Sequence, residues 1–409
     1  MPGSPLIQKC ASYIDTLCEK IPERCVGSQG NRDATTFFRK TLSSFSGWHT
    51  EASEFDAFDW KDNGAMLLSD GHSFLVHASP YSIGCDVKAE LVSASNIAEL
   101  EALNARGKII ILHGEITKEQ LMPKNFVFYN PVEHQQIVSS LEKSGASALV
   151  CATGRNSAIA GGVYPFPLIE DGDFDIPSVY MTEEEGKELL RLVGKTAHLR
   201  SIAERIPGKG YNVTGKKGET QSERIVISAH IDAKKGTPGA IDNATGVAVL
   251  LLLAELLENY QGNMQIEIVA FNGEDYYAVP GQMKYIKENQ NNFNSIVLNI
   301  NIDGAGYKTG DSAFSLFGLP VELDRIVHDI IRQYPGISEG AQWPQGDHSM
   351  FVQMGRPAIA VSSKWFVDNM ENQTITHTKN DNPGIVDVSK LVEIAQALNA
   401  LIRKVTCGV

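Results

Sequence analysis

Five side chains that can bind divalent metal ions lie in the second half of this 409-residue chain. They are two histidines and three aspartates: His230, Asp242, Asp275, Asp303 and His377. A sixth acidic residue, Glu274, stands directly before Asp275. Imidazole and carboxylate donors without a cysteine among them suit zinc, cobalt or manganese rather than an iron–sulfur cluster. Two metals about 3.5–4 Å apart need one bridging carboxylate and terminal donors on each side, and five residues can supply that set.

The elements predicted around these residues would bring them to one edge of a sheet. Apolar segments indicate strands at residues 224–230, 265–271, 294–303 and 358–362, and helical spacing predicts helices at residues 244–259, 282–289, 322–333 and 389–405. Alternation of strands with helices favours a mainly parallel α/β sheet flanked by helices. Functional side chains collect at the carboxyl ends of such strands, which is where His230, Glu274, Asp275 and Asp303 stand.

Each of these residues also has an ordinary structural interpretation. Asp242 precedes a long apolar helix and could serve as its N-cap. Glu274 and Asp275 could form a solvated acidic turn, and His377 could be a surface histidine in a polar loop. The functional alternative for the acidic pair is one carboxylate as metal ligand and its neighbour as the base for a metal-activated water. In His230-Ile-Asp232, the carboxylate could hold the orientation and tautomer of a metal-bound imidazole. The combination in one chain favours the metal site.

The rest of the chain differs in character. Helices are predicted at residues 5–21 and 31–42, and a strand at 48–58. Residues 65–200 indicate a β-rich module with strands at 73–77, 88–92, 108–112, 148–151 and 178–181 and helices at 131–143 and 183–192. A loop at residues 206–210 is expected to end this module. The length favours two domains.

Composition excludes some classes of protein. A net charge of −13 disfavours nucleic acid as a partner, because no basic excess is available to neutralise phosphates. No apolar run reaches about 18 residues, so no membrane span is expected. The first residues lack the pattern of a signal peptide. The six cysteines form no CxxC pair, and we infer reduced thiols and a cytoplasmic protein.

Several motifs together resemble a known family. The segments HIDAKKGTPGAIDNATG, VAFNGED, NIDGAG, GDHSMF and THTKNDNP occur in this order. They are similar to the co-catalytic zinc aminopeptidases, a group that includes aminopeptidase Y and secreted bacterial leucyl aminopeptidases. The resemblance covers residues 200–409 and extends to the N-terminal helices. It implies the zinc-exopeptidase (phosphorylase/hydrolase-like) fold and two Zn²⁺ ions per chain, with cobalt or manganese as alternatives.

The resemblance also implies a role for each residue. Asp242 should bridge the two metals, His230 and Asp303 should complete one, and Asp275 and His377 the other. Glu274 should be the general base, and Asp232 should orient His230. The peptide bond between Asp242 and Asn243 should be cis.

Three positions bear on how closely the chain follows this pattern. Asp275 stands where a glutamate is common, so the second metal could be bound more weakly or slightly displaced. Thr376 stands where several relatives have a tyrosine that stabilises the oxyanion. Asp347-His348 matches a recurrent pair, for which a packing or supporting role is favoured over direct catalysis.

The middle of the chain resembles a protease-associated domain. The matching segments are ARGKIIILHGEI, SGASALVCATG and DIPSVYMTEEEGKELL. Such domains are inserted in the peptidase fold of some relatives, where they act as covers or contribute to substrate access. We therefore expect a peptidase domain at residues 1–60 and 203–409 and an inserted domain at 61–202.

The function predicted from these observations is that of a metallo-aminopeptidase. Its partner would be a peptide substrate with a free N-terminus, and neither nucleic acid nor a membrane is expected to bind. A carboxypeptidase or dipeptidase acting at the same site is the first alternative, and it would need a basic residue for the substrate carboxylate, with Lys234, Lys235, Arg356 and Lys364 as candidates. A metal-free binding protein of the same fold is the second.

Overall fold

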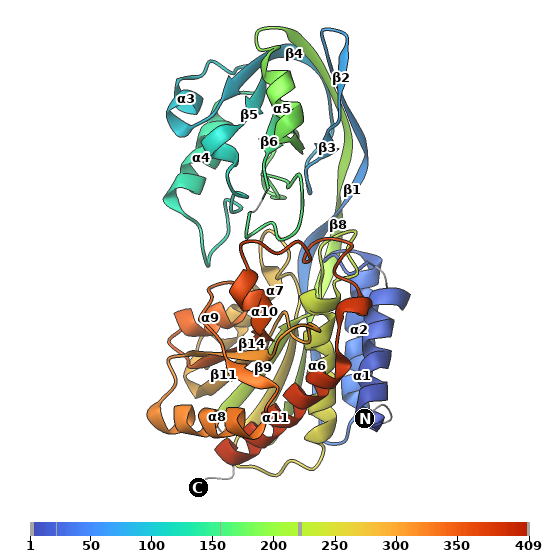
Figure 1. Ribbon diagram of the computed structural model, residues 1–409, viewed down its shortest axis with the longest axis vertical. Coiled ribbons are helices and arrows are strands. Elements are labelled where there is room, and N and C mark those ends of the chain that lie inside the picture. Colours follow the sequence, from blue (N-terminus) through green and yellow to red (C-terminus); the bar gives the residue numbers. More distant parts are fainter. Residues whose placement is uncertain (1–3, 22, 156, 220–222, 407–409) are drawn as a thin grey trace. The chain divides into compact units, whose positions relative to one another are not determined.

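A computed structural model describes residues 4–21, 23–155, 157–219 and 223–406 (Figure 1). The chain forms two compact units. The first contains residues 1–57, 209–370 and 375–409, and the second contains residues 58–208 together with 371–374. From the sequence, the domain boundaries were expected at residues 60 and 203. The short segment Glu371–Thr374 was expected in the first unit, but it belongs to the second.

The first unit is built on a mainly parallel sheet with the strand order β13-β12-β14-β11-β9-β10-β8. The strands β14, β11, β9 and β10 are parallel neighbours, whereas β12 runs antiparallel to β14 and β8 antiparallel to β10. The bounds are β8 (Thr196–Lys217), β9 (Arg224–His230), β10 (Gln265–Phe271), β11 (Ile296–Ile302), β12 (Ser312–Phe317), β13 (Ile337–Glu339) and β14 (Ala358–Ser363). The predicted α/β fold with a mainly parallel central sheet is confirmed.

Helices cover both faces of this sheet. Their bounds are α1 (Pro5–Asp15), α2 (Gln29–Ser44), α6 (Thr245–Leu256), α7 (Pro280–Asn289), α8 (Val321–Gln333), α9 (His348–Gln353), α10 (Lys364–Asn369) and α11 (Val388–Thr406). Helix α6 packs on β9, β10 and β11, while α1, α2 and α11 pack against α6. Residues 245–254 of α6 are all buried, as expected for a helix that is apolar on every side. On the opposite face, Phe271 of β10 contacts Tyr285 of α7 and Phe351 of α9.

The second unit has its own sheet and two apolar cores. Its strand order is β8-β4-β5-β6-β7-β3, with β4, β5, β6 and β7 parallel, and β1 pairs with β2. Alternate residues of β5 feed the two cores: Ile110 and Leu112 enter one, and Ile109 and Ile111 the other. The bounds are β1 (His49–Ser69), β2 (His72–Phe74), β3 (His77–Ala78), β4 (Cys85–Ala94), α3 (Ile97–Ala102), β5 (Ile109–Leu112), α4 (Val132–Lys143), β6 (Ala148–Thr153), β7 (Ser178–Thr182) and α5 (Glu183–Leu190).

One predicted element is wrong. Residues 206–210 were expected to form a loop, but they lie inside the long strand β8. Position 210 requires a glycine because the strand packs closely against β1, and not because the chain turns. A Cβ atom at this position would lie 2.4 Å from the ring of Phe55 in β1. Side chains on either side of Gly210 also reach β1, since Lys209 Nζ donates to Asp56 Oδ1 at 2.7 Å and Tyr211 Oη to Glu54 Oε2 at 2.8 Å.

Two further findings concern the class of protein. Within the part of the chain that the structure describes, no helix combines the length and apolar character that crossing a bilayer requires. Cys10, Cys18, Cys85 and Cys151 carry free thiols, and Cys407 lies outside the described residues. Burial raises the pKa of Cys10 and of Cys151 to about 12.

The packing of Gly210 gives a first prediction. Gly210→Ala should lower the free energy of unfolding by about 1–3 kcal/mol, because the added methyl group overpacks against Phe55. Urea unfolding of the purified protein measures this change. The matched control repeats the substitution in a Phe55→Ala background, where the methyl group has room. An equal loss of stability in both backgrounds would show that the contact with Phe55 is not the cause.

Candidate metal centre

Three parallel strands deliver predicted site residues to the same edge of the sheet. His230 is the last residue of β9 and is level with Phe271 at the end of β10. Glu274 and Asp275 follow β10, and Asp303 follows directly after Ile302, the last residue of β11. Asp242 lies in the irregular turn Ala240–Ala244 before α6, where it has a non-helical backbone conformation.

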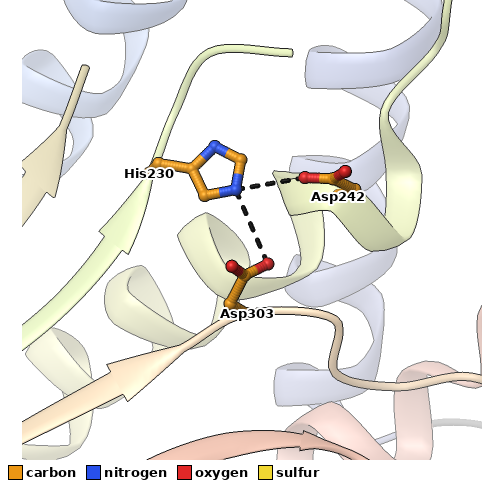
Figure 2. Close-up of side chains that lie close together, drawn as sticks. All are labelled: His230, Asp242 and Asp303. Atoms are coloured by element: carbon orange, nitrogen blue, oxygen red, sulfur yellow. Dashed lines mark ion pairs between the residues drawn. The ribbon is translucent and has the colours of Figure 1, made fainter. Parts of the chain in front are cut away.

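The first group of donors surrounds the imidazole of His230 (Figure 2). Its Nε2 atom lies 3.1 Å from Asp242 Oδ1 and 3.5 Å from Asp303 Oδ1. Figure 2 shows both carboxylates directed at the same ring nitrogen, one from the turn before α6 and one from the end of β11. The donor atoms of the three residues all lie within 4.8 Å of one another.

The second group surrounds His377, and it shares Asp242 with the first. His377 Nε2 lies 3.1 Å from Asp242 Oδ2 and 3.4 Å from Asp275 Oδ1. These donor atoms also lie within 4.8 Å of one another. The two oxygens of Asp242 therefore face different histidines. The structure thus brings all five predicted metal-binding residues together, in two triads that meet at Asp242.

The side chains fit a pair of zinc ions. His230 Nε2 and Asp275 Oδ2 are buried and make no hydrogen bond of acceptable geometry, which is costly unless another group satisfies them. Nitrogen and oxygen donors from histidine and aspartate are ordinary zinc ligands. His230, Asp242 and Asp303 would hold one ion, and Asp242, Asp275 and His377 the other.

The charges of these groups depend on one another. Burial alone would lower the pKa of His230, but the carboxylates of Asp303, Asp232 and Asp242 raise it well above its ordinary value. Burial likewise opposes the charged form of His377, whereas Asp275 and Asp242 raise its pKa. The carboxylates around the two imidazoles would therefore stabilise positive charge on them. Divalent cations would supply the same positive charge and displace those protons.

Asp232 has a contact that the sequence did not predict, because it holds the loop that carries the acidic pair. Its carboxylate accepts hydrogen bonds from the backbone N–H groups of Gly273 at 2.8 Å, Glu274 at 3.3 Å and Asp275 at 3.0 Å. The Nδ1 atom of His230 lies 3.2 Å from the carbonyl oxygen of Asp232 and 3.7 Å from its carboxylate. Asp232 also lies within 4.8 Å of His230 and Asp275 in a third grouping, and its role in orienting His230 stays a prediction.

Two buried charged residues near Asp242 were missed in the sequence. Asp381 accepts from the backbone N–H of Ile241 at 2.6 Å and of Asp242 at 3.1 Å. Burial, reinforced by Asp242, raises the pKa of Asp381 to about 7. Arg24 donates to four carbonyl oxygens, those of Ile231 (3.1 Å), Leu17 (2.6 Å), Pro238 (2.9 Å) and Gly239 (2.7 Å). Its position in a short loop between helices offers no motif that could have revealed it.

The remaining expectations concern the surroundings of the triads. The peptide bond between Asp242 and Asn243 is cis, as the resemblance implied. The carboxylate of Asp347 accepts a hydrogen bond from Gln282 Nε2 at 2.6 Å. His348 is fully buried, contacts Trp343 and Phe317, and has its Nε2 atom 2.9 Å from the carbonyl oxygen of Trp343. These contacts are those of a pair that packs and supports.

An α/β domain with two histidines and three aspartates gathered at the carboxyl edge of its parallel strands has a donor set that suits divalent metal ions. Residues 212–402 match Peptidase family M28. This match confirms the resemblance seen in the motifs.

Individual relatives are distant in sequence. The chain is 23% identical over 199 residues to aminopeptidase YwaD of Bacillus subtilis, and 23% identical over 333 residues to leucine aminopeptidase 2 of Trichophyton tonsurans. These matches cover 47% and 76% of the chain, but only 39% and 62% of the two relatives.

Solved structures match almost the whole chain. An aminopeptidase from Aneurinibacillus sp. strain AM-1 has a TM-score of 0.77 at 21% identity, covering 97% of this chain and 93% of that one. BSAP, a zinc aminopeptidase from Bacillus subtilis, has a TM-score of 0.74 at 18% identity, covering 98% and 95%. At these identities the comparison shows a shared fold.

The hydrogen bonds that Arg24 donates to four carbonyl groups give a second prediction. Arg24→Met should lower the free energy of unfolding by about 3 kcal/mol or more, because it removes the donor from several buried carbonyl groups at once. Denaturant unfolding measures this change. Arg325→Met on α8 is the matched control, since Arg325 is exposed and pairs with nearby acidic residues of its own helix, and it should change stability by less than about 0.5 kcal/mol. Similar small losses in both variants would contradict a structural role for Arg24.

Proposed function

We propose that this protein is a metallo-aminopeptidase that hydrolyses the N-terminal peptide bond of peptides, with two zinc ions and Glu274 as general base. The observation that carries the proposal is the position of Asp242, whose two oxygens each lie 3.1 Å from a different histidine. A carboxylate shared in this way is what a two-metal site needs as its bridge. The M28 match of residues 212–402 supports a peptidase.

The zinc ions, when bound, would lower the pKa of water and polarise the carbonyl group of the scissile bond. Glu274 stands next to Asp275 in the chain, and its backbone N–H group is held by Asp232. Burial raises the pKa of Glu274 well above its ordinary value, and the carboxylates of Asp275, Asp303 and Asp347 add to this effect. A carboxylate with a raised pKa is suited to take a proton from the attacking water and return it to the leaving amine.

The contacts of four basic residues argue against a carboxypeptidase. Lys234 Nζ donates to the carbonyl oxygen of Asp275, and Lys235 pairs with Glu23. Arg356 donates to the carbonyl oxygen of Asn294, and Lys364 pairs with Asp368. Each candidate for binding a substrate carboxylate is therefore engaged within the protein, whereas the acidic surroundings of the triads suit the positive charge of a free N-terminus.

The second unit is proposed to be a protease-associated domain. The three segments that resemble such a domain form β5, β6 and the β7–α5 pair, and these strands are direct parallel neighbours. A cytoplasmic location stays a prediction from the amino-acid sequence.

Replacing the proposed base gives a third prediction. Glu274→Gln should retain the fold and the bound zinc but lose about 10²–10⁴-fold in kcat, because an amide cannot accept the proton. Hydrolysis of leucyl anilide and zinc content by atomic absorption measure the two properties. Glu322→Gln, an exposed residue on α8, is the control and should behave as the wild type. Near-normal turnover of Glu274→Gln would refute the assignment of the base.

Blocking either end of the substrate gives a fourth prediction. Peptides amidated at the C-terminus should be cleaved as fast as free peptides, whereas N-acetylated peptides should resist, because an aminopeptidase needs the free amine. A chelator should abolish hydrolysis, and added zinc, cobalt or manganese should restore it. The reverse pattern of end-group dependence would indicate a carboxypeptidase. A protein that binds no metal and hydrolyses nothing would be a binding protein of the same fold.

A further inference from the structure

The backbone of Asp275 is held on both sides by residues of a single loop. This loop follows β9 and contains Asp232 and Lys234, two residues apart. The carboxylate of Asp232 accepts the N–H group of Asp275 at 3.0 Å. The Nζ atom of Lys234 donates to the carbonyl oxygen of Asp275 at 3.1 Å. The two peptide units that flank the Cα atom of Asp275 are therefore fixed from the same loop.

This fixation matters because aspartate is a short ligand. Its carboxylate is joined to the backbone through a single methylene group, so only two side-chain torsions can adjust its position. A glutamate has a third torsion and can correct for a displaced backbone, whereas an aspartate cannot. The carboxylate of Asp275 nevertheless reaches His377, with Oδ1 at 3.4 Å from Nε2. The position of its main chain must then be set closely by the surrounding contacts.

Lys234 also brings a positive charge close to Asp275, since its Nζ atom lies 3.1 Å from the carbonyl oxygen of that residue. Lys234 is half-buried, so its charge is screened less than that of an exposed lysine. It therefore acts on Asp275 in two ways: through the hydrogen bond to the main chain and through its charge.

Building on the proposed function, we propose that Lys234 is a positioning residue for the metal held by Asp275 and His377. It does not touch that metal or the substrate. Through the carbonyl group of Asp275 it fixes the direction of a ligand that is too short to adjust by itself. Groups that orient a metal ligand from behind typically contribute about 10–100-fold to metal affinity.

Zinc binding to the metal-free protein tests this inference. Titration against a chromophoric zinc chelator should resolve two binding steps in the wild type, and His377→Ala should identify the step that belongs to Asp275 by removing it. Lys234→Met keeps an unbranched side chain of similar length without the donor and the charge. It should weaken that same step by about 10–100-fold and leave the other unchanged. Lys234→Arg keeps both features and should restore most of the affinity.

The adjacent lysine supplies the matched control. Lys235→Met removes a lysine from the same loop, but Lys235 pairs with Glu23, so both zinc steps should remain as in the wild type. Thermal unfolding of each metal-free variant measures whether the loop is damaged. Unchanged zinc binding by Lys234→Met would overturn this inference and leave the proposed function intact. If Lys234→Met weakened both zinc-binding steps equally, or lowered the stability of the metal-free protein in proportion to the loss of zinc affinity, Lys234 would have a general structural role. Either result would also overturn the inference. A wild-type protein that binds no zinc would overturn the proposed function and the inference with it.

Discussion

The sharing of Asp242 between two histidines is the interaction on which the site depends. His230 arrives at the end of β9, while His377 arrives from a loop almost 150 residues later (377 − 230 = 147). Asp242 meets both of them, one with each oxygen. Carboxylates buried this close together repel one another unless cations balance them. Positive charge placed between them, from imidazolium groups or from metal ions, would offset this repulsion and allow Asp275 and Asp303 to lie beside Asp242.

The charged residues around the triads hold main chain rather than side chains. Asp232 binds three consecutive amide groups of the loop after β10, and Asp381 binds two in the turn before α6. Arg24 binds carbonyl oxygens at Ile231, Pro238 and Gly239, on both sides of the loop between β9 and that turn. Loops at a strand edge lack the hydrogen-bonding ladder of the sheet. Buried side chains supply the missing partners and so fix where each donor atom points.

The parts of the site that follow from strand periodicity could be predicted from the sequence. β9 and β10 have the bounds that their apolar runs predicted, so His230, Glu274 and Asp275 fall where expected. Residues 206–210 show the limit of this reasoning, because Pro207, Gly208 and Gly210 look like turn residues until the ring of Phe55 is known to lie against Gly210. Short elements such as α9 and α10 were also missed, since six residues carry little periodic signal.

Arg24 and Asp381 could not be predicted for a different reason. Their partners are backbone groups, and a backbone group has no residue type that a sequence pattern could record. Lys234 belongs to the same class: its partner is the carbonyl oxygen of Asp275, which any residue would present there. The donor set of a metal site can thus be recognised from the types and order of its side chains. The contacts that hold those donors in position become visible only in the folded chain, because they depend on the paths of the loops.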